Sequence, residues 1–297
     1  ILHIYEGSFF MLNSICIKTN RKKVIAYLLK AFETFPMESV SLSHREFKLY
    51  HNIILHYSGD NVEFFHYHVC DILVDTILSC YEKSKLKQYI ELNYFYFSEE
   101  EKEIILDHCL SYLNTSENID SLNRKDDIYI ALLKYISENK SIVLDGFINF
   151  RLSNYMKLLD STIDLCVNDF IIEREYNEFV HLLQAYISSK EPSLDLVHLI
   201  YLEEDSLLID SKKNIIPIDR NCFGAKYLSD ITFSSNDFIL NTLLTILPQK
   251  IILHLIDEEN EFTHTIQSIF ENRVTLCKDC SICNTYKLLH HVNPQKI

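Results

Sequence analysis

Apolar and polar positions follow two different periods in the first part of the chain. The segment "SICIKT" (14–19) alternates with a period of two and predicts a strand, whereas "RKKVIAYLLKAFETF" (21–35) repeats apolar residues at helical spacing. Asn20 is the expected N-cap of that helix. Residues 39–58 alternate like strands again and lead to a Gly-Asp turn. Residues 1–60 are therefore predicted to form a small α/β unit of strand, helix and strand.

The middle of the chain, residues 61–192, carries an almost wholly helical pattern. Ser98 is followed three residues later by Glu101, which predicts a capping box at a helix start. A proline near position 192 ends the pattern. The segments in which apolar residues recur every three or four positions are 62–83, 98–113, 126–139 and 147–188.

From residue 193 the period changes once more. Short apolar or alternating runs predict strands at 194–202, 206–211, 250–256 and 273–277, and helices are predicted at 235–247 and 261–272. Residues 193–297 should thus form a C-terminal α/β unit of three to five strands, whose last strand leads directly into a cysteine-rich end. The fold class predicted for the whole chain is α+β, with a mostly helical middle region.

Charge and composition narrow the classes of function. A net charge of −14 repels phosphate backbones and anionic lipid surfaces, so we expect neither nucleic-acid nor membrane-surface binding. No apolar run approaches the roughly 18 residues of a membrane span, and no export signal is recognisable. We therefore expect a cytoplasmic protein whose nine cysteines are thiols or metal ligands rather than disulfides. With only four glycines, the chain has no G-x-G-x-x-G or P-loop motif for nucleotide phosphates.

Candidate chemistry is concentrated in the C-x-x-C-x-x-C sequence of Cys277, Cys280 and Cys283. A tight turn can point such thiolates at one metal ion; zinc takes four tetrahedral ligands, and iron–sulfur clusters are held by cysteines. Residues 284–286 do not supply the fourth cysteine of a ferredoxin run. The spacing therefore favours zinc over an iron–sulfur cluster, and it leaves a cluster of empty thiols as the alternative.

A histidine is the expected fourth ligand. His290 and His291 lie seven and eight residues beyond Cys283, close enough to loop back, and His254 lies within the predicted strand 250–256. His198 occupies a similar position in the strand 194–202. A histidine in a buried strand needs a bonding partner, so His198 and His254 could face one another across neighbouring strands. Their simpler interpretation is a pair of bonded strand histidines, and the other is a His/Cys site at the sheet edge.

Weaker candidates have simpler explanations. A dithiol redox pair lacks the spacer and the nearby cis-proline of the thioredoxin pattern. Polar helix residues that could form a functional surface are more simply solvated or ion-paired faces, and the alternating "FHYHVCD" (65–71) points in different directions on a helix. These residues are Arg151 with Tyr155, Glu175 with Glu178 and Arg174, and the packing residues His66, His68 and Cys70.

Five segments in the second half of the chain resemble successive blocks of the YtxC-like sporulation protein family of endospore-forming bacteria. In order, they are "DGFINFRLSNY" (145–155), "FIIEREYNEFVHLLQ" (170–184), "EPSLDLVHLI" (191–200), "KIILHLI" (250–256) and "NRVTLC" (272–277). The resemblance implies a cytosolic protein associated with sporulation, and it carries no established activity or catalytic residues.

The sequence therefore favours a binding or scaffolding protein, with protein partners and a structural metal site, over an enzyme. A metal-dependent enzyme and a thiol redox sensor that use Cys277, Cys280 and Cys283 are the alternatives. The two metal-binding hypotheses differ in coordination, because a structural zinc has four protein ligands and a catalytic zinc keeps a position open.

Overall fold

The computed structural model describes residues 13–35, 39–115, 119–202, 206–218, 234–256 and 258–292, without the side chains of 119–122 and 290–292. The chain forms two compact units, Ile1–Ile171 and Ile172–Ile297. Each unit contains one mixed sheet, and most of the remaining described chain is helical. The predicted α+β class with a helical middle region is confirmed. The division into the segments 1–60, 61–192 and 193–297 stays a prediction.

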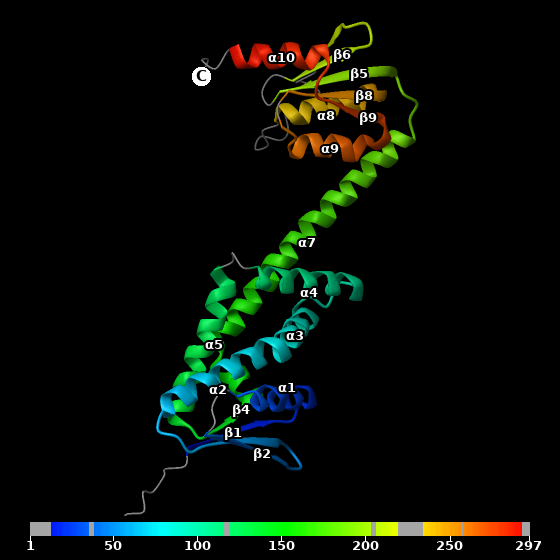
Figure 1. Cartoon of the computed structure of the whole chain (residues 1–297). Helices are drawn as coiled ribbons and strands as arrows, with labels where there is room; N and C mark the ends of the chain where they lie inside the picture. The colour runs from blue at the N-terminus through cyan, green and yellow to red at the C-terminus, as the bar shows by residue number, and fades with distance from the viewer. Residues whose placement is uncertain are drawn as a thin grey trace, which may run out of the picture. The chain divides into compact units, whose positions relative to one another are not determined.

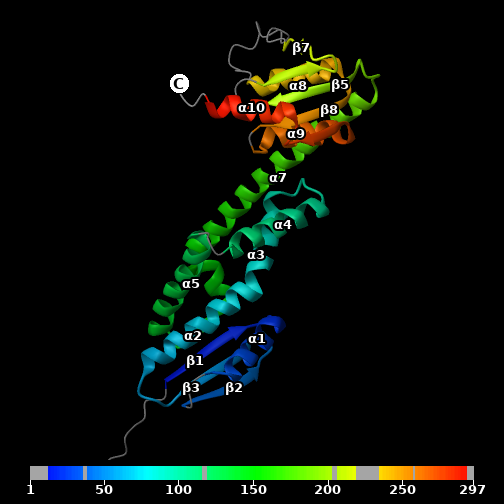
Figure 2. The same ribbon diagram turned by 45° about the horizontal axis from the view of Figure 1, so that its top comes forward.

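The first unit contains a four-stranded sheet in the order β2-β3-β1-β4. The strands β1, β2 and β3 of this sheet are labelled in Figure 2. Its antiparallel strands pair β2 with β3 and β3 with β1, while β4 joins β1 in parallel. Alternate side chains of β1 and β3, among them Ile17 and Leu55, are fully buried, as the period of two requires. The strand bounds are β1 Asn13–Thr19, β2 Val40–Glu46, β3 His51–Tyr57 and β4 Ser141–Val143.

Helices complete this unit and share one hydrophobic core with the sheet, from Ile15 to Phe170. The predicted helix 62–83 is longer than expected and contains a π-helical segment. The bounds are α1 Lys22–Glu33, α2 Val62–Ile77, the π-helix η1 Leu78–Glu82, α3 Lys83–Asn93, α4 Glu99–Asn114, α5 Ile119–Glu138 and α6 Leu144–Arg151. The helix α7, Ser153–Ser188, begins in this unit and continues into the second.

The two cap predictions have different outcomes. Ser98 and Glu101 form the expected capping box at the start of α4. The prediction of Asn20 as the cap of α1 is wrong, because Arg21 occupies the N-cap position and its side chain makes no capping bond. Instead, the amide of Arg21 donates to the hydroxyl of Thr19 at 3.2 Å. The side chain of Arg21, which makes no capping bond, turns toward other elements instead.

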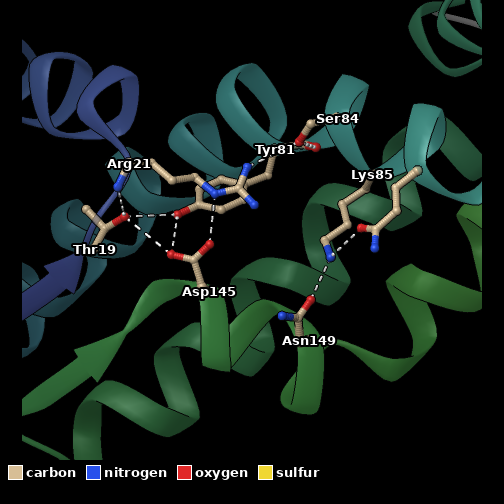
Figure 3. A network of polar contacts seen from close by, with 8 residues as sticks. Thr19, Arg21, Tyr81, Ser84, Lys85, Asp145 and Asn149 are labelled. Carbon is tan, nitrogen blue, oxygen red and sulfur yellow. Dashed lines mark hydrogen bonds and ion pairs between the residues drawn. The ribbon is translucent and has the colours of Figure 1, made fainter. Parts of the chain in front are cut away.

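Arg21 joins a polar network at the carboxyl ends of the parallel strands β1 and β4 (Figure 3). Its Nε donates to Asp145 Oδ1 at 2.8 Å, and its guanidinium lies over the ring of Tyr81, 4.5 Å from the centroid. The hydroxyl groups of Tyr81 and Thr19 donate to the other carboxylate oxygen of Asp145, at 3.3 and 3.4 Å. The Asp145 carboxylate therefore links α6, the end of β1 and the π-helix.

Replacing Asp145 with alanine should lower the free energy of unfolding of the first unit by about 1–2 kcal/mol, because three donors lose a partly exposed anionic acceptor. Chemical denaturation followed by circular dichroism measures the change. Glu63→Ala is the matched control for loss of a carboxylate in the first turn of a helix. Equal stability of the two variants would show that the network contributes nothing beyond the helix terminus.

A second polar group lies inside the helical core. Glu82 and Arg124 are 4% and 3% exposed, and Arg124 Nε lies 3.6 Å from Glu82 Oε2. The hydroxyl of Tyr155 donates to the same carboxylate oxygen at 3.1 Å, and Arg124 Nη2 donates to Asn114 at 3.2 Å. Burial raises the pKa of Glu82, although Arg124 and Tyr155 oppose that shift. The π-helix thus presents Tyr81 to one polar network and Glu82 to another.

The second unit contains a five-stranded sheet in the order β7-β6-β5-β8-β9. The strands β5, β8 and β9 are parallel, and β6 and β7 extend the sheet in antiparallel fashion. The bounds are β5 Leu194–Tyr201, β6 Leu207–Asp210, β7 Ile215–Ile216, α8 Ser235–Ile246, β8 Pro248–Leu255, α9 Glu261–Phe270, the 3₁₀-helix η3 Glu271–Arg273, β9 Val274–Cys277 and α10 Ser281–Val292.

The two faces of this sheet have different covers. In Figure 1, α8 and α9 lie on one side of the sheet and α10 on the other. Leu253 and its alternate neighbours belong to the core formed with α8, α9 and the end of α7. On the opposite face, Ile200, Leu202 and Ile256 form a small cluster with Cys283 of α10. Within the described residues, partly buried side chains such as Leu207 and Tyr286 pack against these four residues.

No helix within the described ranges is both long enough and apolar enough to cross a membrane.

Candidate metal centre

The site begins with the pairing of two parallel strands. His254 near the end of β8 is the register partner of Cys277 at the end of β9. Side chains of paired residues in neighbouring strands point to the same face, so this register places an imidazole beside a thiol. Cys280 lies in the turn that follows β9, and Cys283 lies in the first turn of α10. The end of β8, the end of β9 and the first turn of α10 therefore meet at one point.

The four donor atoms have the spacing of ligands to a single ion. His254 Nδ1 lies 3.3 Å from Cys280 Sγ and 3.4 Å from Cys283 Sγ. Cys283 Sγ lies 3.7 Å from Cys280 Sγ and 3.8 Å from Cys277 Sγ, and all four atoms lie within 4.8 Å of one another. Zinc–sulfur bonds of about 2.3 Å and zinc–nitrogen bonds of about 2.0–2.1 Å would separate tetrahedral ligands by about 3.6–3.8 Å. The donor set fits a mononuclear zinc site.

The same spacing disfavours a polynuclear iron–sulfur cluster. In a four-iron cluster each cysteine binds a different iron, which would hold the sulfurs farther apart than the 3.7 and 3.8 Å found here, and in a two-iron cluster at most two cysteines share an iron, whereas three sulfurs lie together here. Three sulfurs and one imidazole are also a common structural zinc set. The preference for zinc over an iron–sulfur cluster stays a prediction.

The turn between β9 and α10 aims the sulfurs inward. The amide of Cys283 approaches Cys280 Sγ at 3.5 Å, and the thiol of Cys283 donates to the Cys277 carbonyl at 3.3 Å. The amide of Asn284 donates to the Cys280 carbonyl at 2.9 Å and begins the regular hydrogen bonding of α10. Cys283 is fully buried and His254 is 2% exposed, whereas Cys277 and Cys280 are partly exposed.

The electrostatic environment is mixed. Partial burial opposes ionisation of Cys280, yet hydrogen bonds from the Cys283 amide and from the neighbouring thiols hold its pKa below the ordinary value. Burial raises the pKa of Cys283 to about 11. Burial and the adjacent His198 lower the pKa of His254, which favours the neutral imidazole that a metal requires. A cation at the centre would favour the thiolate forms that the protein alone does not fully stabilise.

His198 lies behind His254 on the same face of the sheet. Its Nδ1 lies 2.9 Å from His254 Nε2, and the two rings are nearly parallel, with an interplanar angle of 18°. The expectation that these strand histidines face one another across β5 and β8 therefore holds. Both interpretations contribute, since the histidines are bonded to each other and His254 also joins the cysteines.

Of the three histidines considered as the fourth ligand, the structure describes the side chain of His254 alone. His254 is the histidine that reaches the three sulfurs. The side chains of His290 and His291 lie outside the described part of the chain. Their role as ligands stays a prediction.

Arg151 and Tyr155, two of the weaker candidates, lie in the first unit. Arg151 and Tyr155 do not share a helix face, because α6 ends at Arg151 and α7 begins at Ser153. Tyr155 is buried against Glu82, and the guanidinium of Arg151 lies 5.9 Å from the ring centre of Tyr135.

The other helical candidates are ion-paired or packed. Arg174 Nε and Glu178 Oε1 form an exposed ion pair at 3.9 Å. His68 Nδ1 lies 3.9 Å from Asp71, and Cys70 is part of the hydrophobic core. They support the simpler explanations that the sequence suggested.

Comparison with known proteins adds the family. A family model described as the YtxC-like family matches residues 67–275, more than two-thirds of the chain. The uncharacterized protein YtxC of Bacillus subtilis (strain 168) is 25% identical over 214 residues, which are 69% of this chain and 74% of the relative. No solved structure matches. The matched range includes His198 and His254 and ends two residues before Cys277, and by its extent the chain belongs to the YtxC-like family.

Proposed function

We propose that the second unit is held together by a structural zinc ion bound to His254, Cys277, Cys280 and Cys283, and that the protein acts by binding or scaffolding. The observation that carries this proposal is the closed set of four donor atoms within 4.8 Å of one another. Four protein ligands fill the tetrahedral coordination of zinc and leave no position for a water or a substrate.

The metal has a clear structural task in this unit. Among the described residues, the apolar cluster beneath α10 has four fully or nearly buried members, with partly buried residues packed against them. A zinc ion would add bonds that connect α10 to β8 and β9. Metal binding would then contribute directly to the folding free energy of the sheet edge and of α10.

The cellular setting is part of the proposal. A reducing cytoplasm would keep the three cysteines as free thiols, which lose their protons when they bind a metal ion. The association with sporulation is what the family resemblance implies, and the net charge of −14 favours protein partners over nucleic acids. Counts of heat-resistant spores after deletion of the gene in its native host test the sporulation role; unchanged counts would contradict it.

The two alternatives make different predictions for the same residues. A catalytic zinc would have three protein ligands and an open position, so one of the four residues could be replaced without loss of metal. A thiol redox sensor would show reversible oxidation of Cys280 and Cys283 without bound metal. A catalytic zinc with three ligands would account for His254 beside Cys280 and Cys283, but it would leave the sulfur of Cys277, 3.8 Å from that of Cys283, without a role.

Elemental analysis of the tag-free chain should find about one zinc per molecule, as a closed four-ligand site requires. The Cys16→Ser variant, which changes a partly exposed thiol of β1, should retain the same zinc content and serves as the control. A zinc content below about a tenth of an equivalent in the unmodified chain would contradict the proposed centre.

A further inference from the structure

We propose that His198 is a positioning residue for the zinc centre, which holds the imidazole of His254 in the orientation and tautomer that the metal requires. This inference rests on the proposed zinc site. Through His198, the strand β5 influences the metal affinity although it supplies no ligand. The observation behind it is the 2.9 Å distance between His198 Nδ1 and His254 Nε2.

The two nitrogens of His254 have separate partners. Its Nδ1 faces the sulfurs of Cys280 and Cys283, while its Nε2 faces His198. When Nδ1 is the metal-binding atom of a neutral imidazole, the proton must be on Nε2. That N–H needs an acceptor because His254 is 2% exposed. His198 Nδ1 supplies the acceptor, so the proton of His198 is assigned to its own Nε2.

The strand register makes this contact rigid. Ile200 is the direct register partner of His254, and Ile252 is the partner of His198. The histidines are therefore diagonal neighbours on one face of two parallel strands, with their backbones fixed by the ladder. β5 and β8 are also neighbours in the interior of the sheet, between β6 and β9. An acceptor held by such strands orients its partner more accurately than one held by a loop.

The expected consequence is a loss of metal affinity without loss of a ligand. Residues that accept the second ring proton of a ligating histidine orient the ring and raise its basicity, and their replacement typically weakens metal binding about 10- to 100-fold. His198→Phe keeps a ring in the strand but removes the acceptor. His198→Asn keeps an acceptor oxygen close to the position of Nδ1.

Competition between the full-length chain and a zinc chelator of known affinity tests the inference. His198→Phe should weaken zinc binding about 10- to 100-fold, and His198→Asn should recover most of that loss. With Co²⁺ in place of zinc, the ligand-field absorption bands should shift in His198→Phe and return toward the unmodified spectrum in His198→Asn. His56→Phe, at another partly buried strand histidine, is the matched control and should change neither.

The outcomes separate the two proposals. If the unmodified chain binds no zinc, the proposed centre is wrong, and this inference fails with it. If the unmodified chain binds zinc and His198→Phe has the same affinity and cobalt spectrum, only the positioning role is wrong. Equal loss in His198→Phe and His198→Asn would also contradict it, because an acceptor at the position of Nδ1 would then not restore zinc binding. If circular dichroism shows that His198→Phe is unfolded, His198→Val replaces it as the variant without an acceptor.

Discussion

Replacing Cys283 with alanine should abolish stoichiometric zinc binding and release α10 from the sheet. Cys283 is the central ligand of the proposed site, because its sulfur lies within 3.8 Å of both other sulfurs and its thiol is fully buried. At a free zinc concentration a thousandfold above Kd, the lost metal corresponds to about 4 kcal/mol of stability. Hydrogen exchange followed by mass spectrometry should show lost protection in residues 281–289.

The control for this variant is Cys70→Ala, which removes another fully buried thiol from the first unit. It should reduce local protection around α2 and leave the zinc content and the exchange of α10 unchanged. Chelation of the unmodified chain should reproduce the exchange pattern of Cys283→Ala. Full protection of α10 after complete zinc removal would show that apolar packing alone holds the helix.

Replacing Arg124 with methionine should destabilise the first unit by about 3–5 kcal/mol, because it leaves the Glu82 carboxylate buried without its cation. The double variant Glu82→Gln with Arg124→Met should recover a large part of that loss, since it removes the buried charge as well. Denaturant unfolding of the single and double variants measures the coupling. A double variant that is as unstable as Arg124→Met would contradict the assignment of the cost to an unpaired charge.

The loss in Arg124→Met should grow with pH. Burial already raises the pKa of Glu82, and removal of Arg124 takes away the largest opposing influence. A carboxyl group with a raised pKa in the folded state binds a proton more readily there than in the unfolded chain, so stability falls as pH rises through the folded-state value. The destabilisation should therefore be smaller near pH 5 than near pH 8. A loss that is independent of pH between these values would contradict it.

Much of the fold follows from local periodicity. The strands β1 and β3 alternate buried and exposed side chains, and β8 carries the apolar run that "KIILHLI" predicted. The capping box of Ser98 and Glu101 marks the start of α4 within one residue. These elements could be predicted because the spacing of apolar residues within each segment shows which of its faces is buried.

The missed elements depend on distant partners or on small local irregularities. The strand β4 is three residues long and pairs with β1, which lies more than 120 positions earlier in the chain. The π-helical segment η1 lies inside a continuous helical pattern. The apolar spacing of that pattern does not show where the hydrogen bonds change from four to five residues apart. The helix α10 was not predicted, although Ile282 and Tyr286 lie four residues apart, as on one face of a helix.

Part of the candidate site could also be predicted from the spacing of residues along the chain. The three cysteines are close in sequence, so their spacing alone indicates a shared ligand site. The fourth ligand depends on sheet order, because His254 reaches the sulfurs only if β8 is the neighbour of β9 in this register. The sequence allowed His290, His291 or a strand histidine such as His254, and the strand pairing brings His254 to the cysteines.

X-ray absorption at the zinc edge of the tag-free, full-length chain tests the proposed centre most directly. The proposed ligand set predicts a first shell of three sulfurs at about 2.3 Å and one nitrogen at about 2.0–2.1 Å, with no water oxygen. The His254→Ala variant should lose the imidazole contribution to the spectrum while the sulfur contribution persists. A first shell of oxygen and nitrogen atoms alone, or a bound water in the unmodified chain, would contradict a closed structural zinc centre.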